Sequence, residues 1–315
     1  MKYILIDADT GIDDSLAILF ALKRRDVRVM GVTTCCGNTD AFQAAENTLR
    51  LIKLAKVPYE VPVAIGANAP LSGKWEGPVP HIHGGNGIGD VELPPTQQKP
   101  LEEQGADFIV RCVHENPGKL TLVTLGRMTN LALALEKEPQ LPQLVREVIF
   151  MGGTYHAPGN VSPVAEANIA GDPEAADIVL QAGFRITMVG LDVTLKTRLT
   201  AQHLEMLTKY AAPENAPIAA YLNEAMKLYY RFNRRQNNCL DHCPVHDPTA
   251  LLVAVDPALV TIRTMPARVE CGGTFCRGMI VTDDREHPID APGLSICVDI
   301  DGRRAVEELL TTFMD

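Results

Sequence analysis

Short aliphatic runs alternate with segments of helical periodicity over the first two-thirds of the chain, and this alternation limits the possible folds most. Uninterrupted aliphatic runs are typical of strands buried on both faces. The runs lie at residues 3–6, 27–34, 61–65, 120–125, 148–151 and 185–193. The helical segments lie at 15–23, 41–55, 104–115, 129–137 and 173–181. This order predicts an α/β fold with a mostly parallel central sheet flanked by helices.

The last third of the chain departs from strict alternation. Two helices are predicted at 201–210 and 217–233, then strands at 260–270, 274–282 and 294–298, and a closing helix at 303–313. No Pro/Ser-rich linker, low-complexity tract or internal repeat divides the 315 residues, of which 46% are hydrophobic. We therefore expect residues 1–315 to form a single Rossmann-like domain with a substantial core.

Unusual polar residues follow the predicted strands. In parallel sheets, ligands bind beyond the carboxyl ends of the strands, so these residues are expected on one rim. They are Asp7 and Asp9, residues 36–38, His81 and His83, residues 126–130, the loop 153–168, and Asp192. The pattern predicts one active site at the carboxyl edge of the sheet.

The first of these positions is the most unusual, because Asp7, Asp9, Asp13 and Asp14 lie within eight residues. Carboxylates repel one another, so either a cation gathers them or they spread over solvent. Asp13 and Asp14 are expected in the first turn of a helix, where free N–H groups and the helix dipole stabilise negative charge. Oxygen ligands with no nearby histidine or cysteine favour Ca²⁺ or Mg²⁺ over zinc.

Other interpretations of IDADTGIDD compete with a cation site. An EF-hand is excluded, because the positions that require Gly and Glu hold Ile12 and Ile18. A haloacid-dehalogenase-like phosphatase would use Asp7 as a phosphorylated nucleophile and Asp9 as an acid, with TDD at 282–284 as distal metal-binding acids. The remaining alternative is a capped, solvated helix start without chemistry.

A second polar feature is PVHDP, which places His246 directly beside Asp247 at a predicted loop-to-helix junction. His246 also ends a short cluster whose spacing is similar to that of a zinc knuckle. The cluster consists of Cys239, His242, Cys243 and His246. These residues lie in one short segment, whereas structural zinc sites usually join two, so thiols without a metal are the expected state.

The chain resembles the inosine–uridine-preferring nucleoside hydrolases over essentially its full length. The resemblance rests on several motifs in the same order and at similar spacing, of which DADTGIDD is the family's signature. The motifs are DADTGIDD at 7–14, CGN at 36–38, HIHG at 81–84, GRMTNLA at 126–132, MGG at 151–153, GN at 159–160, AEANIAGDPEAA at 165–176 and VHDP at 245–248.

The resemblance implies that the protein cleaves the N-glycosidic bond of ribonucleosides with water, giving ribose and a free base. It implies a Ca²⁺ ion held by Asp9, Asp14, Asp247 and the main-chain carbonyl of Leu125. Asp13 would be the general base for the nucleophilic water. Because Ca²⁺ accepts roughly six to eight oxygen ligands, it could hold the ribose 2′- and 3′-hydroxyls and a water together.

The same resemblance assigns residues around the ribose. The amide and carboxyl groups of Asn38, Asn160, Glu166 and Asn168 are expected to bind its hydroxyls. Met151 is expected to lie under the sugar, although core packing would explain a methionine equally well.

Around the base, His246 matches the family's leaving-group acid, and the near-neutral pKa of a histidine suits that task. Its presence favours the branch that acts on inosine, uridine or cytidine. Tyr229 or Tyr230 is expected over the base, and His83 is expected as a contact at the rim.

Bulk properties exclude several partners. The formal net charge is −10 and Lys and Arg are not clustered, which argues against a nucleic acid polymer. No segment approaches the roughly 20 apolar residues that span a membrane, and the apolar run before Asp7 is too short for a signal peptide. We expect a cytoplasmic protein whose partner is a small-molecule ribonucleoside.

Two points stay open at this level. The resemblance implies a homodimer or homotetramer, and no residue decides between them. A non-catalytic ribose- or nucleoside-binding protein is the third class of function, in which Asp13 and His246 would be idle.

Overall fold

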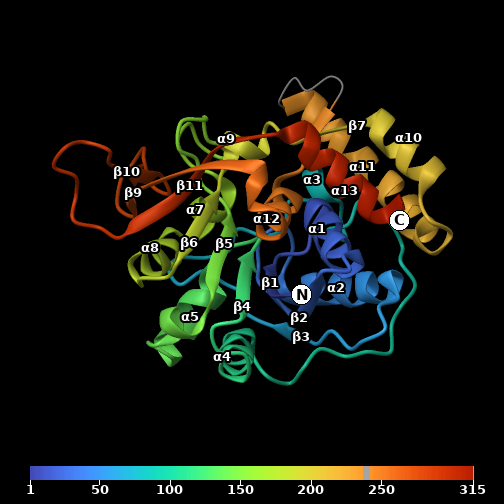
Figure 1. Ribbon diagram of the computed structural model, residues 1–315, viewed down its shortest axis with the longest axis horizontal. Helices are drawn as coiled ribbons and strands as arrows, with labels where there is room; N and C mark the ends of the chain where they lie inside the picture. Colours follow the sequence, from blue (N-terminus) through green and yellow to red (C-terminus); the bar gives the residue numbers. More distant parts are fainter. Residues whose placement is uncertain (237–241, 315) are drawn as a thin grey trace.

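The computed structural model describes residues 1–236 and 242–314. In this part of the chain a nine-stranded sheet lies at the centre of an α/β fold, in the order β10-β9-β11-β6-β5-β4-β1-β2-β3 (Figure 1). All pairings from β3 to β11 are parallel, whereas β9 runs antiparallel to β10 and β11. The predicted fold class is confirmed.

The strands have the following bounds: β1 Lys2–Ala8, β2 Val27–Thr34, β3 Val63–Ile65, β4 Leu120–Thr124, β5 Glu147–Met151, β6 Ile186–Val189, β9 Val260–Val269, β10 Ile280–Thr282 and β11 Gly293–Ile300. A separate antiparallel pair consists of β7 (Arg198–Thr200) and β8 (His242–Pro244).

Helices cover both faces of the central sheet (Figure 1). One face packs against α1 (Ile12–Lys23), α2 (Ala41–Ala55), α12 (His246–Val255) and α13 (Gly302–Met314). The other packs against α4 (Gly105–Glu115), α5 (Thr129–Lys137) and α8 (Pro173–Gln181).

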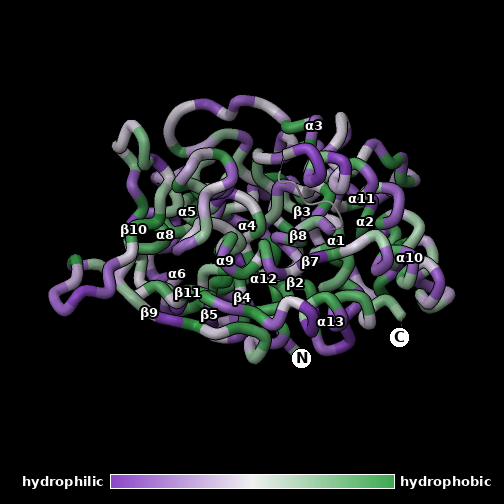
Figure 2. The backbone as a smooth tube through the Cα atoms, turned by 90° about the horizontal axis from the view of Figure 1, so that it is seen from above, coloured by the Kyte–Doolittle hydropathy of each residue, from purple (hydrophilic) through white to green (hydrophobic). Residues whose placement is uncertain are grey.

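The two apolar layers arise from the alternation of side chains along each strand. In β1, Ile4 and Ile6 belong to the first layer, and Leu5 belongs to the second. The inner strands β1, β4 and β5 are mostly buried and lack a polar face, whereas β9 at the antiparallel side of the sheet is largely exposed. Hydrophilic residues concentrate instead on outer loops, including the loop between β10 and β11 (Figure 2).

Shorter or peripheral helices complete the described chain. They are α3 Pro80–His83, α6 Leu141–Leu144, α7 Ala167–Gly171, α9 Leu191–Thr194, α10 Ala201–Tyr210 and α11 Ala216–Gln236, with 3-10 turns at Pro213–Asn215 and Pro257–Leu259.

The strand order reverses between β1 and β4, which are hydrogen-bonded neighbours. From β1 the chain proceeds to β2 and β3 on one side, and later to β4, β5 and β6 on the other. At such a reversal the loops leaving the two strands diverge and open a crevice at their carboxyl ends. This reversal lies between Asp9, which follows β1, and Leu125, which follows β4.

Most predicted elements are found, and those at 41–55, 129–137, 173–181 and 201–210 have the predicted bounds. The strand predicted at 274–282 covers only Ile280–Thr282, because Gly278 turns the chain with a φ of +83°. The run at 185–193 leaves the sheet at Val189, since Gly190 begins helix α9.

The N-cap of α2 directly follows Asn38 and Thr39. Asp40 fills this position, and its carboxylate accepts hydrogen bonds from the main-chain N–H groups of Phe42 and Gln43 at 2.9 and 2.8 Å. This frees Asn38 to contact the acidic cluster described next.

Candidate active site

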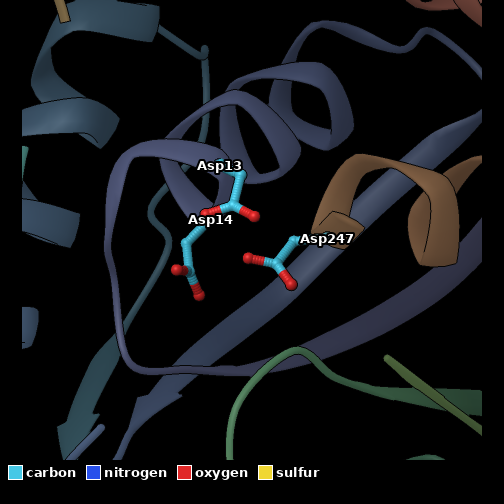
Figure 3. Close-up of side chains that lie close together, drawn as sticks. All are labelled: Asp13, Asp14 and Asp247. Carbon is cyan, nitrogen blue, oxygen red and sulfur yellow. The ribbon is translucent and has the colours of Figure 1, made fainter. Parts of the chain in front are cut away.

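Three carboxylates from opposite ends of the chain meet at the crevice. Asp13 and Asp14 lie in the first turn of α1, Asp247 lies in the first turn of α12, and one oxygen of each lies within 4.8 Å of the others (Figure 3). The two helices pack side by side, which brings their N-terminal ends together. All three side chains are buried.

Local backbone geometry positions this cluster. The Gly11 N–H donates to Asp14 Oδ2 at 2.8 Å, closing the first turn of α1. A Cβ at position 11 would lie 2.6 Å from both Asn38 Nδ2 and His83 Nδ1. Only glycine fits there without displacing these two side chains.

Asp9 is held by two glycine-containing loops. Its Oδ2 accepts the N–H of Asn38 at 2.7 Å, and a Cβ at Gly37 would lie 1.9 Å from the same oxygen. A Cβ at Gly126 would lie 2.9 Å from Oδ1. Asn38 Nδ2 also donates to Asp14 Oδ2 at 3.0 Å, so Asn38 links Asp9 to Asp14.

The electrostatics of the cluster favour a bound cation. Burial raises the pKa of Asp13 to about 6, with repulsion from Asp9 adding to the effect. Burial and the charges of neighbouring carboxylates raise the pKa of Asp14 and Asp247 well above the usual range. A divalent ion would remove this repulsion.

The hydrogen-bonding state of Asp14 is consistent with a cation. Its Oδ1 is buried and receives no hydrogen bond from the residues that the structure describes. An unsatisfied buried carboxylate oxygen is costly unless something outside the chain binds it. The donor set consists of hard oxygens, so the residues fit Ca²⁺ or Mg²⁺.

Leu125 follows β4 at the same edge. Its N–H donates to the main-chain carbonyl of Asp7 at 2.7 Å, which joins the ends of β4 and β1. Its own carbonyl accepts a hydrogen bond from Asn168 Nδ2 at 2.6 Å. This carbonyl therefore points toward the loop that carries Glu166 and Asn168, rather than into a strand pairing.

Glu166 and Asn168 organise that loop. The buried Glu166 carboxylate caps α7, accepting the N–H groups of Asn168 and Gly153, each at 2.9 Å. Burial raises the pKa of Glu166 to about 7. Asn168 Nδ2 also donates to the carbonyl of Met151 at 3.2 Å, and the Met151 side chain is buried.

Asn160 lies at the outer end of the same loop. Its Oδ1 accepts the N–H of Ala167 at 3.0 Å, and its side chain is exposed. The structure thus places Asn160 beside α7, the helix that also carries Asn168.

Two histidines lie on the other side of the cluster. His246 begins α12, and its Nδ1 lies 2.8 Å from Thr194 Oγ1. His83 Nδ1 accepts the N–H of Ile12 at 3.0 Å. Burial lowers the pKa of His246 to about 4 and that of His83 to about 3, so His246 does not have the near-neutral pKa expected from the sequence.

Of the two candidate tyrosines, Tyr229 contacts the carboxylates. Its hydroxyl donates to Asp13 Oδ2 at 3.2 Å, and its ring lies 5.8 Å from that of His83. The Tyr230 hydroxyl donates instead to the main-chain carbonyl of Leu199 at 2.7 Å. The two side chains leave α11 in different directions because adjacent helical residues are about 100° apart.

Comparisons with known proteins identify the family of this chain. A model of the family described as inosine-uridine preferring nucleoside hydrolase matches residues 4–307. The chain belongs to this family. Uridine nucleosidase 1 of Arabidopsis thaliana is 38% identical over 280 residues, covering 89% of this chain and 81% of that protein. The inosine-uridine preferring nucleoside hydrolase of Leishmania major is 35% identical over 287 residues, covering 90% and 88%.

Solved structures extend the comparison to the whole fold. The plant nucleoside hydrolase PpNRh1 superposes with a TM-score of 0.93 at 34% identity, covering 99% of both chains. A purine-preferring ribonucleoside hydrolase from Gardnerella vaginalis also has a TM-score of 0.93 at 34% identity, covering 99% and 98%. The protein is therefore a ribonucleoside hydrolase that cleaves N-glycosidic bonds, and its family is of a metal-dependent type.

The environment of Asp7 in this nucleoside hydrolase disagrees with the phosphatase alternative. Asp7 is 3% exposed, and its Oδ1 accepts hydrogen bonds from Thr33 Oγ1 and Asn130 Nδ2 at 2.5 and 2.7 Å. A nucleophile must reach its substrate, whereas this carboxylate faces the interior between β1, β2 and α5. The binding-protein alternative is not favoured either, since the relatives are hydrolases.

The possible zinc cluster of the nucleoside hydrolase falls partly outside the described residues, because Cys239 is not among them. Within them, Cys243 is buried with its Sγ 3.8 Å from the carbonyl of Leu199, and His246 Nδ1 contacts Thr194. Among the described helices, none has the length and apolar character needed to cross a membrane.

Sequence reasoning missed two residues of the site. Asn130, seen only as part of a rim segment, also donates to the carbonyl of Thr34 and accepts from the N–H of Ala67. Thr194, beside His246, has no local signal, because a threonine after a strand is unremarkable until the fold brings it to a partner.

Proposed function

We propose that Asp9, Asp14, Asp247 and the main-chain carbonyl of Leu125 hold a Ca²⁺ ion in this hydrolase. The observation that carries the proposal is the convergence of Asp13, Asp14 and Asp247 in one buried cluster. When bound, the ion supplies positive charge that attracts the ribose 2′- and 3′-hydroxyls and makes a nearby water more acidic.

Asp13 is the proposed general base. Its oxygens lie within the cluster, and Tyr229 donates to Oδ2, which leaves Oδ1 to accept a proton from the attacking water. The raised pKa of Asp13, about 6, makes it a better proton acceptor than an exposed aspartate. The adjacent carboxylates also stabilise the positive charge that develops on the ribose as the glycosidic bond breaks.

Four polar residues are proposed to bind the ribose: Asn38, Asn160, Glu166 and Asn168. Asn38 already bridges Asp9 and Asp14, so a ribose hydroxyl near the ion would also be near its amide. Glu166 and Asn168 are ordered by mutual hydrogen bonding, which positions them before substrate arrives. Met151 is proposed to lie beneath the sugar.

On the base side, His246 is the proposed proton donor to the departing base. His83 and Tyr230 are proposed to line the same side, with Tyr230 anchored to the Leu199 carbonyl and Tyr229 placed beside Asp13. The proposed substrates are inosine, uridine and cytidine. Relatives named for uridine and for purines are similar to this chain, so the base range needs direct measurement.

Three further statements belong to the proposal. Residues 1–315 form one domain, because strands near both ends of the chain share one sheet. The enzyme is a cytoplasmic homodimer or homotetramer, which fractionation and light scattering would test.

A substrate panel tests the core of the proposal. Inosine, uridine, cytidine, adenosine and guanosine would be assayed for release of ribose, before and after removal of metal by a chelator. We expect hydrolysis of the first three, its loss on chelation, and its return with Ca²⁺. Full activity in chelator would contradict the metal assignment, and no ribose release from any nucleoside would contradict the substrate class.

A further inference from the structure

Helix α9 (Leu191–Thr194) places one hydroxyl against the proposed leaving-group acid. Thr194 is fully buried, and its Oγ1 lies 2.8 Å from His246 Nδ1. Within the described chain, Oγ1 has no other side-chain or main-chain hydrogen-bond partner. A buried hydroxyl needs a hydrogen-bond partner, and here that partner is His246 Nδ1.

Main-chain contacts hold both members of this pair in place. Gly190 is the N-cap of α9, and its carbonyl accepts the N–H of Thr194 at 3.1 Å. Three residues later, the carbonyl of Thr197 accepts the N–H of Val245 at 3.1 Å, directly before His246. The separation of Thr194 and His246 is therefore set by the backbone and does not depend on flexible side chains.

We propose that Thr194 is a positioning residue that holds the His246 imidazole with Nδ1 toward α9, so that Nε2 faces the departing base. This inference rests on the proposed role of His246. Because the two ring nitrogens lie on different sides of the ring, fixing one fixes the direction of the other.

A hydroxyl suits this position because it can act in both directions. It donates to Nδ1 when that nitrogen carries no proton, and it accepts from Nδ1–H when it does. In the cleavage step, the C1′–N bond breaks and its electron pair passes to the base. The base takes the Nε2 proton of the imidazolium form of His246, which becomes a neutral imidazole, while the oxygen of water adds to C1′ and its proton passes to Asp13.

His246 lies beside the groups of the proposed general base. Asp247, the residue after His246, belongs to the cluster with Asp13 and Asp14. His83 packs on Tyr229 with ring centroids 5.8 Å apart, and Tyr229 donates to Asp13 at 3.2 Å. Through Asp247, His246 is therefore next to the acidic cluster that contains the proposed general base.

The test compares Thr194→Val, which removes the hydroxyl at nearly constant volume, with Thr194→Ser, which retains it. Two substrates would be used: the best nucleoside of the panel, and p-nitrophenyl β-D-ribofuranoside, whose leaving group departs without protonation. For Thr194→Val we expect kcat on the nucleoside to fall about 10-fold or more with little change in KM. On the nitrophenyl riboside we expect a change of about 2-fold, and Thr194→Ser should recover most of the loss.

Thr197→Val is the matched control, since Thr197 is also buried in this segment but its side chain does not contact His246. It should leave the ratio of the two activities unchanged. An equal fall on both substrates for Thr194→Val, or no fall on either, would overturn the inference.

NMR spectroscopy of the histidine side chains tests the position of the His246 ring without an activity assay. The chain has 8 histidines, so ¹⁵N-labelled imidazole signals can be assigned with His246→Ala. We expect the Nδ1 signal of His246 to show a hydrogen bond in the wild type and to lose it in Thr194→Val, with unchanged Ca²⁺ affinity. An unchanged His246 signal would contradict the positioning role.

Parallel measurements on His246→Ala separate the two proposals. If this variant loses activity on both substrates equally, the leaving-group role of His246 is wrong. If His246→Ala loses activity on the nucleoside alone, and Thr194→Val keeps that activity, only the inference about Thr194 is wrong.

Discussion

Main-chain N–H groups hold the proposed metal ligands Asp9 and Asp14, whereas side-chain hydroxyls contact the two residues proposed to move protons, Asp13 and His246. Asp9 and Asp14 accept the N–H groups of Asn38 and Gly11, respectively. On the other side, His246 meets a threonine hydroxyl and Asp13 meets a tyrosine hydroxyl.

Main-chain and side-chain contacts respond differently to substitution. A main-chain N–H persists whatever side chain a residue carries, so the carboxylates keep their positions under most substitutions. A side-chain contact disappears with one substitution. We therefore expect ribose and metal chemistry to be robust, and base preference to respond to single changes on α9, α11 and α12.

Asp13→Ala should produce the largest effect. Loss of a general base lowers kcat by at least about 100-fold, and the loss should be similar for every base because Asp13 acts on water. Steady-state assays would measure this, and calorimetry should show that Ca²⁺ still binds. A variant that binds nucleoside but is unchanged in turnover would point to another base.

Substrates without a 2′-hydroxyl should show the next largest effect. Loss of one contact to a charged site costs about 1.5–3 kcal/mol, which corresponds to roughly a 10- to 100-fold fall in kcat/KM. The measurement compares 2′-deoxyuridine with uridine. Equal rates for uridine and 2′-deoxyuridine would show that the site does not bind the 2′-hydroxyl.

The metal-free protein should lose stability as the pH rises. Asp13 and Glu166 have folded-state pKa values of about 6 and 7, above their ordinary values of 3.8 and 4.5. The folded protein thus keeps protons that the unfolded chain releases, so this stabilisation is complete below pH 4 and lost toward pH 7. We expect the Tm in chelator to fall by roughly 5 °C between pH 5 and 7.5.

Added Ca²⁺ provides the control for this effect. It should raise the Tm most at pH 7.5, where the carboxylates carry their charge, and least at pH 5. A Ca²⁺ effect independent of pH would indicate binding away from the acidic cluster.

The smallest effects are expected from substitutions of Tyr229 and Tyr230. Tyr229→Phe removes the donor to Asp13 and should lower kcat by roughly 10-fold. Tyr230→Phe removes the bond to the Leu199 carbonyl, and should change activity by about 2-fold while costing about 1 kcal/mol of unfolding free energy. A larger loss of activity in Tyr230→Phe would show that its hydroxyl also contacts the substrate directly.

The central sheet was predictable because each buried parallel strand is an aliphatic run of its own. Helices with a clear boundary were also predictable, as with α8, where Asp172 precedes Pro173 and caps the helix. The strand predicted at 274–282 was wrong in extent, since most of that segment turns outward at a glycine instead of pairing. Short exposed strands lack the continuous apolar pattern that identifies buried ones.

By itself, the sequence determined the fold class, the family and the identity of the acids, because these depend on local patterns and on motifs read in order. Only the tertiary structure decided which groups meet: Asp247 with Asp13 and Asp14, Tyr229 rather than Tyr230 with Asp13, and Thr194 with His246. These pairs join segments far apart in the chain. Their contacts follow from the packing of α1, α9, α11 and α12, which no local pattern encodes.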